Sequence, residues 1–165
     1  MMGQRGRTAS TWVLASLGAC VAGCMGSNFS HGASHAPRPA IQHESSAIVF
    51  VSPPPKSKMP KGVQMAVLEG DPTKEGVFTL RLRTPPGFSL PRHTHPVDER
   101  VTVLEGSVSV GFGKVQGDSG ERTFGPGSFY VNPQGVPHYV FSEQGAVLQI
   151  TGEGPWRVDL VASGL

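Results

Sequence analysis

The sequence predicts an all-β protein whose folded part is a single antiparallel β-barrel or jelly roll. Its 22 glycines and 15 prolines disfavour long helices. From Gly62 onward, short runs of β-branched and aromatic residues alternate with turn residues, which is typical of strands joined by tight connections. At 165 residues the chain has room for one domain of ordinary size. We expect a signal peptide over residues 1–23, a disordered linker over residues 24–61 and the barrel over residues 62–165.

The expected strands are short, and no amphipathic helix is expected between them. One of them alternates Phe78, Leu80 and Leu82 with polar residues, so it should have one buried and one solvated face. The His-rich stretch before Arg100 is expected to be a loop between two strands, and the polar stretch 113–121 a hairpin loop. The segments expected to form strands are 64–69, 77–83, 100–104, 107–112, 128–131, 138–142, 146–151 and 156–161.

Residues 1–23 have the features of an export signal. Arg5 and Arg7 precede an apolar stretch over residues 11–22, which is too short for a comfortable membrane span. Residues 21–24 (VAGC) resemble the lipobox of bacterial lipoproteins, in which the signal is cleaved before a cysteine that is then acylated. The resemblance implies lipidation of Cys24. Cys20 (in LGAC) is a weaker match, and a plain secretory signal with an incidental cysteine is the competing interpretation.

The lipoprotein resemblance implies an exported protein attached to the bacterial cell envelope by a stable lipid anchor. Met25 follows Cys24 in place of the aspartate linked with inner-membrane retention, which favours the periplasmic side of the outer membrane. Residues 25–61 have the Ser-, His- and Pro-rich composition of a tether. The apolar run 47–51 is the exception and is a candidate edge strand.

Charge and cysteine content limit the partners of the mature chain. Without Arg5 and Arg7, the 12 remaining basic residues balance the 12 acidic ones. No basic stripe remains, so nucleic acid is not expected as a partner. Both cysteines precede residue 25, so the barrel has no disulfide and no thiolate ligand.

The chemistry concentrates in the stretch 87–106. His93, His95 and Glu99 occupy odd positions there, and on an extended strand their side chains would point the same way. Two imidazoles and a carboxylate on one face can hold a divalent transition metal. His138 is a fourth candidate ligand, and residues 60–165 contain no histidine other than these three.

These residues resemble the two motifs of the cupin superfamily. The first motif is matched by Gly87, His93, His95, Glu99 and Gly106. The second is matched by Gly127, Pro133, Gly135 and His138. One departure is Ser142, which stands where the family usually has asparagine. The resemblance covers about residues 60–165 and implies a cupin barrel in which the three histidines and Glu99 bind the metal.

Three imidazoles and a carboxylate suit Fe, Mn, Zn, Ni, Co or Cu better than Ca or Mg. Four protein ligands in an octahedral shell leave two positions for water, O₂ or a small-molecule substrate. Two functions compete. The first is an oxygenase-type, metal-dependent enzyme. The second is a non-catalytic module that binds a small ligand or senses metal, because no acid or base beyond the ligands is securely placed in the barrel. The resemblance also implies a homodimer formed by exchange of an edge strand.

Four further residues are candidates for contacts around the ligands. Asp98 is near enough in sequence to accept the second N–H of a histidine ligand. Arg100 has even numbering and is expected to face outward. Tyr130 and Tyr139 are the remaining candidates, each close to one of the two motifs.

Overall fold

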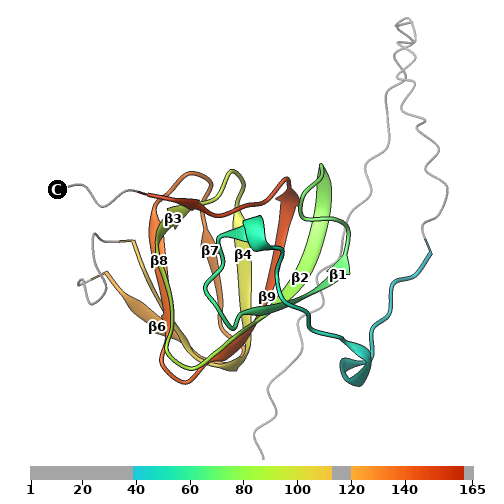
Figure 1. Cartoon of the computed structure of the whole chain (residues 1–165), viewed down its shortest axis with the longest axis horizontal. Helices are drawn as coiled ribbons and strands as arrows, with labels where there is room; N and C mark the ends of the chain where they lie inside the picture. Colours follow the sequence, from blue (N-terminus) through green and yellow to red (C-terminus); the bar gives the residue numbers. More distant parts are fainter. Residues whose placement is uncertain (1–38, 113–119, 162–165) are drawn as a thin grey trace, which may run out of the picture. The chain divides into compact units, whose positions relative to one another are not determined.

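The computed structural model describes residues 39–112 and 120–161, which form two packed antiparallel sheets (Figure 1). One sheet has the strand order β1-β2-β9-β4-β7 and the other β10-β3-β8-β5-β6. The predicted all-β barrel or jelly roll is therefore confirmed. The strands are β1 (Gln64–Glu69), β2 (Gly76–Thr84), β3 (Phe88–Thr94), β4 (Glu99–Gly106), β5 (Val108–Gly111), β6 (Arg122–Phe124), β7 (Phe129–Asn132), β8 (His138–Ser142), β9 (Ala146–Gly154) and β10 (Asp159–Leu160).

Two of these strands differ from the expected pattern. β3 forms where the His-rich stretch was expected to be a loop, and β6 begins directly after the expected hairpin loop. In β3, Phe88 and Leu90 are buried while Ser89 and Pro91 are exposed. The alternation ends at a register shift of the β3–β8 ladder between Leu90 and His93, after which the odd-numbered His93 is buried. β3 pairs with β8 on one side and with β10 on the other.

The core lies between the two sheets. As expected, Phe78, Leu80 and Leu82 of β2 are all buried, and they meet Val101 and Val103 of β4 in the same apolar cluster. Burial of each large side chain contributes about 1.5–3 kcal/mol. This apolar core fills the space beside the histidines and holds the two sheets in place.

Glycines set the turns between the strands. Gly106 ends β4 with φ of 68°, and a Cβ there would collide with the carbonyl oxygen of Gly145. Gly135 has φ of 70° in the turn that leads into β8. Non-glycine residues rarely adopt such backbone angles. Both motif glycines therefore occupy turns that favour glycine.

The segment before β1 runs along the barrel. Val51 makes one isolated antiparallel bridge to Met65, with hydrogen bonds of 2.9 and 2.7 Å. Only this one ladder position of the candidate edge strand 47–51 forms, and Ser45–Ala47 is a single 3₁₀ turn. A second 3₁₀ turn, Pro55–Ser57, precedes Met59, which packs against the core.

The expected signal peptide, Cys20 and Cys24 lie outside the described residues. Within residues 39–112 and 120–161, no helix has the length and apolar character needed to cross a membrane.

Candidate metal centre

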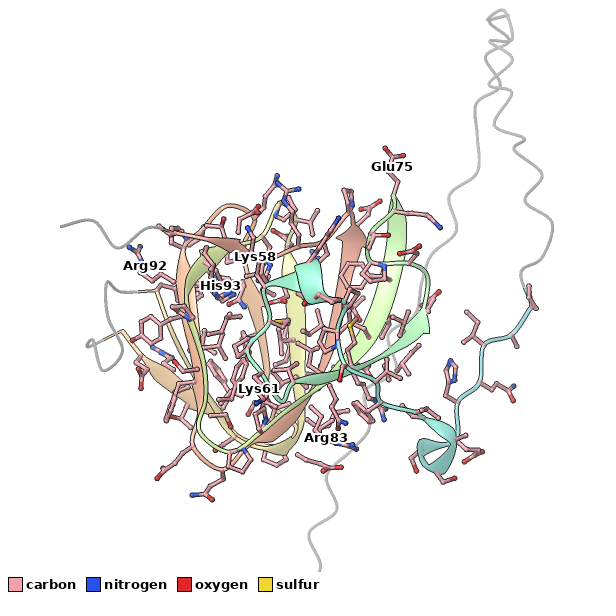
Figure 2. All side chains as sticks on the ribbon, viewed as in Figure 1. Lys58, Lys61, Glu75, Arg83, Arg92 and His93 are labelled. Atoms are coloured by element: carbon pink, nitrogen blue, oxygen red, sulfur yellow. The ribbon has the colours of Figure 1, made fainter. Side chains whose placement is uncertain are left out.

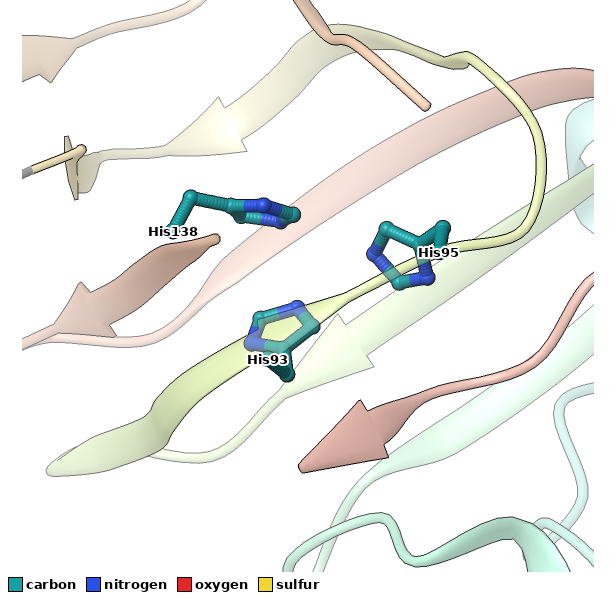
Figure 3. A group of neighbouring side chains, drawn as sticks. All are labelled: His93, His95 and His138. Atoms are coloured by element: carbon teal, nitrogen blue, oxygen red, sulfur yellow. The ribbon is translucent and has the colours of Figure 1, made fainter. Parts of the chain in front are cut away.

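Three buried histidines lie close together (Figure 3). His93 lies on β3 directly opposite His138 on β8, and His95 follows the end of β3. One ring nitrogen from each lies within 4.8 Å of the others. The exposed fractions of these residues are 1% for His93, 2% for His95 and 0% for His138. The structure thus brings together the histidines of both motifs, which are more than forty residues apart.

The tautomer of each ring follows from its hydrogen bond. Nδ1 of His93 lies 2.7 Å from the carbonyl oxygen of Pro91, Nδ1 of His95 lies 2.8 Å from that of Arg157, and Nδ1 of His138 lies 3.1 Å from that of Val136. A carbonyl oxygen only accepts, so each Nδ1 carries the proton and donates it. In the neutral rings every Nε2 then carries a free lone pair, and an imidazole binds a metal through such a lone pair.

The fourth predicted ligand, Glu99, comes from the opposite sheet. Its Oε2 accepts a hydrogen bond from Nδ2 of Asn132 at 2.8 Å, and its Oε1 accepts one from Nε1 of Trp156 at 3.1 Å. Oε2 also lies 3.3 Å from Nε2 of His95. Glu99 is therefore beside His95 and held by two donors, although the group of atoms that lie within 4.8 Å of one another comprises the three histidines alone. Its role as a ligand remains a prediction.

Two buried nitrogen atoms of the cluster have no hydrogen-bond partner: Nε2 of His95 and Nε2 of His138. Unpaired buried polar atoms are costly and are rare in native proteins. In the neutral tautomer, the Nε2 lone pair of His95 also faces a carboxylate oxygen of Glu99. That contact is favourable only when a proton or a metal cation lies between them. The donor set of three imidazoles and one carboxylate therefore fits a divalent transition metal.

Burial and charge shift the pKa values of the cluster in different directions. Burial, with His138 nearby, lowers the pKa of His93 to about 4. Burial also lowers the pKa of His138. For His95 the lowering by burial is outweighed by the charge of Glu99, so its pKa is raised. Burial alone would raise the pKa of Glu99, but His95 and Asn132 outweigh it and hold the carboxyl ionised. The shifts of His93, His138 and Glu99 favour the neutral imidazoles and the ionised carboxylate that metal binding requires, whereas a metal at His95 would have to displace the proton that Glu99 favours there.

A small chamber of about 30 Å³ adjoins His93, His95 and Glu99. Its volume is on the scale of a single water molecule. The remaining walls are mostly apolar, and Tyr130 contributes a phenol. Burial, together with the charge of Glu99, raises the pKa of Tyr130 far above its usual range, so the phenol keeps its proton at neutral pH.

The other candidate residues have different positions. Asp98 does not hold an imidazole: it accepts hydrogen bonds from the backbone N–H of Gln134 at 2.9 Å and from Arg100 at 3.2 Å. Backbone carbonyls take the place that Asp98 was expected to fill. Arg100 is exposed, as its numbering indicated, and Tyr139 is buried against Gly111.

Two contributors to the site were not foreseen, Asn132 and Trp156. Asn132 is 0% exposed and lies directly opposite Glu99 in the β4–β7 ladder. The indole of Trp156 stacks on His95, with ring centroids 5.3 Å apart. The only sequence feature that could have indicated a role for Asn132 is its place just before the Pro133–Gly135 turn. No feature of the sequence indicated a role for Trp156.

The two-sheet barrel with a buried histidine cluster defines a small cupin. The sequence profile described as the ChrR cupin-like domain matches residues 45–156. The chain belongs to this cupin family.

Solved cupin structures share the fold. The acetylacetone dioxygenase from Acinetobacter johnsonii has a TM-score of 0.57 and 20% identity, covering 74% of this chain and 78% of that one. The polyketide cyclase RemF from Streptomyces resistomycificus has a TM-score of 0.55 and 20% identity, covering 73% and 86%. At this identity the likeness concerns the fold alone.

Curated relatives include germin-like proteins of plants. Germin-like protein 1 of Brassica napus is 38% identical over 65 residues, which are 39% of this chain and 31% of that protein. Germin-like protein 12-2 of Oryza sativa subsp. japonica is 37% identical over 73 residues, which are 41% and 32%. The chain spans about a third of the length of these two relatives.

Proposed function

We propose that this chain binds one divalent transition metal through His93, His95, His138 and Glu99 and uses it in oxygenase-type chemistry on a small organic molecule. The observation that carries the proposal is the arrangement of the three Nδ1 atoms. Each donates to a backbone carbonyl, which leaves three Nε2 lone pairs in one buried group. Such fixed orientation is how proteins prepare imidazoles for a metal.

The residues around the ligands have separable roles in this proposal. A bound metal would supply Lewis-acid and O₂ chemistry. Asn132 and Trp156 orient Glu99 through its two oxygens. The apolar walls of the chamber exclude bulk water, which strengthens the electrostatic interactions inside it. Tyr130, with its raised pKa, can donate a hydrogen bond or a proton to a bound molecule.

A second function, non-catalytic binding of a small ligand or sensing of the metal, is favoured by the chamber itself. Its volume of about 30 Å³ leaves little room beside the ligands. Among the described residues that line it, Tyr130 is the one acid–base group beyond the candidate ligands, and a protonated phenol is no general base. This function keeps the same metal centre but requires no turnover.

We further propose that the protein is exported and lipid-anchored through Cys24. The support is the sequence of residues 1–24. Metabolic labelling with an alkyne fatty acid should mark the full chain and the Cys20→Ala variant but not Cys24→Ala. Labelling that is lost in Cys20→Ala instead would place the anchor at Cys20. If even the unsubstituted chain is not labelled, the proposed lipid anchor is wrong.

Metal analysis of the purified protein tests the metal centre. The double variant His93→Ala/His95→Ala should lose stoichiometric metal because two of the four donors are gone. His43→Ala is the matched control: His43 is exposed and bonds the carbonyl of Leu68, away from the cluster, so its removal should leave the metal content unchanged. Stoichiometric metal in the double variant would disprove the assignment.

Oxygen uptake separates the enzyme from the binder. The Fe- or Mn-loaded protein should consume O₂ in the presence of at least one member of a panel of phenols, diketones and thiols. If no compound supports uptake while some still raise the melting temperature, the binding function is the correct one.

A further inference from the structure

A larger groove lies beside this chamber. It encloses about 300 Å³, which is the lower end of the range for small-molecule sites and ten times the volume of the chamber. Met59, Leu82, Trp156 and Val158 line both spaces. The groove therefore adjoins the chamber beside the metal centre.

The groove is apolar along its walls and basic at its rim. Pro54, Pro72 and Trp156 contribute rigid apolar surface, while Lys56 and Lys58 are exposed. Within the described part of the chain, neither lysine side chain makes a hydrogen bond or an ion pair. The other two charged residues lining the groove, Arg157 and Asp159, neutralise each other across 2.9 Å.

Two uncompensated positive charges beside an apolar wall are complementary to one class of ligand. We propose that this groove binds a small organic anion with a flat apolar body, such as an aromatic carboxylate, and forms the outer part of the substrate site. The apolar body would lie against Trp156, and the carboxylate would face Lys56 and Lys58. As a substrate site the groove rests on the proposed metal function, but binding of the anion itself does not require the metal.

The backbone at Lys58 allows a clean test of the charges. Lys58 has φ of 59° in the left-handed region, where asparagine is tolerated better than most residues. Lys56→Gln/Lys58→Asn therefore removes both charges without adding strain. Lys56→Arg/Lys58→Arg keeps them. Lys61→Gln removes a charge from the same segment outside the groove, and Figure 2 shows Lys58 and Lys61 well apart.

Tryptophan fluorescence of the full chain gives the readout. The chain has two tryptophans, so a Trp12→Phe background leaves Trp156 as the reporter. Benzoate should change its emission along a saturable curve, and benzamide, which has the same shape without the charge, should bind more weakly. Removing both lysine charges should weaken benzoate binding by roughly three- to tenfold, since exposed ion pairs contribute modestly, and should leave benzamide unaffected.

Several outcomes would overturn the inference. They are equal binding of benzoate and benzamide, full benzoate affinity in the charge-removed variant, or equal loss in Lys61→Gln. A signal that follows protein concentration, with a doubled mass in light scattering, would assign the groove to a second copy of the chain. All titrations are repeated after metal removal. Benzoate binding that survives there supports the groove even if oxygenase activity is never found.

Met59 tests the link between the groove and the chamber. Truncation of this shared wall residue in Met59→Ala should join the two spaces. In Co(II)-loaded protein, benzoate should then change the visible absorption of the metal more strongly than in the unsubstituted chain. An unchanged spectrum, with benzoate bound in the groove, would overturn the connection to the metal centre.

Discussion

Two carboxylates of this chain have pKa values held below the usual range, and they lie in opposite surroundings. Glu99 is 5% exposed inside the barrel, and its Oε2 lies 3.3 Å from Nε2 of His95. Asp71 lies in the β1–β2 turn, and its side chain is 41% exposed beside Lys74. The Asp71–Lys74 contact of 2.9 Å is even shorter than the 3.3 Å between Glu99 and His95.

The comparison separates a site from a surface contact. Around Asp71, water can solvate both charges, so the short distance alone indicates little stabilisation. Around Glu99, desolvation opposes the charge, and the carboxylate stays ionised only because His95 and Asn132 outweigh that cost. A lowered pKa that persists against burial, beside unpaired imidazole nitrogens, indicates where a cation is expected.

The largest effect is expected when Glu99 loses its charge. Glu99→Gln keeps the shape and an oxygen acceptor for Trp156 but removes the negative charge that faces His95. Metal affinity should fall by at least about tenfold, since residues that support or join a metal shell have effects of this order. Competition with a coloured chelator measures it. An unchanged affinity would show that the three histidines bind the metal without Glu99.

The existence of a histidine site was predictable from the sequence, because it depends on residue types and their spacing. The absence of cysteine and the histidine census pointed to an imidazole site. The argument that His93, His95 and Glu99 share one face of an extended strand was wrong. β3 ends at Thr94, β4 begins at Glu99 in the other sheet, and a register shift between Leu90 and His93 turns His93 inward. The prediction that His138 joins the site depended on the motif resemblance. The β3–β8 pairing that places His138 opposite His93 cannot be read from a local stretch of sequence.

The contacts that hold Glu99 were not predictable, for physical reasons. Asn132 reaches it through the register of β4 against β7, and Trp156 reaches it from beyond the end of β9. Both depend on tertiary pairing between distant segments. Asp98 was expected to orient an imidazole, but backbone carbonyls fill that role and Asp98 holds the turn at Gln134 instead.

An intermediate effect is expected at Asn132. Asn132→Ala removes a buried 2.8 Å hydrogen bond to a charged oxygen of Glu99, which should lower the free energy of unfolding by about 1.5–3 kcal/mol. Urea unfolding of the metal-free protein measures this change. Metal affinity should also fall, roughly tenfold, because Glu99 is less well oriented.

Gln149→Ala is the matched control for Asn132. Gln149 accepts a hydrogen bond from Arg81 at 3.2 Å on the same sheet but away from the cluster. Its removal should change stability less and leave metal affinity as it was. If both variants bind metal equally well, Asn132 has only a structural role, and the support of Glu99 by its neighbours is less important than we infer.

The smallest effect is expected at Asp71. Asp71→Asn keeps an oxygen acceptor for the N–H of Thr73 and removes only the charge. The hydrogen bond with Lys74, followed by those with Thr73, lowers the pKa of Asp71 in the folded state. The contribution of the Asp71 charge to stability is therefore present above the unfolded-state pKa of about 3.9 and is lost as the pH falls through the folded-state value.

The melting temperature of Asp71→Asn should be slightly lower than that of the unsubstituted chain at pH 7. The difference should shrink in strong acid and in about 1 M salt, and the metal content should stay constant. If Asp71→Asn loses as much stability as Asn132→Ala, the comparison is wrong. The exposed charge of Asp71 would then contribute as much to stability as the buried contact of Glu99.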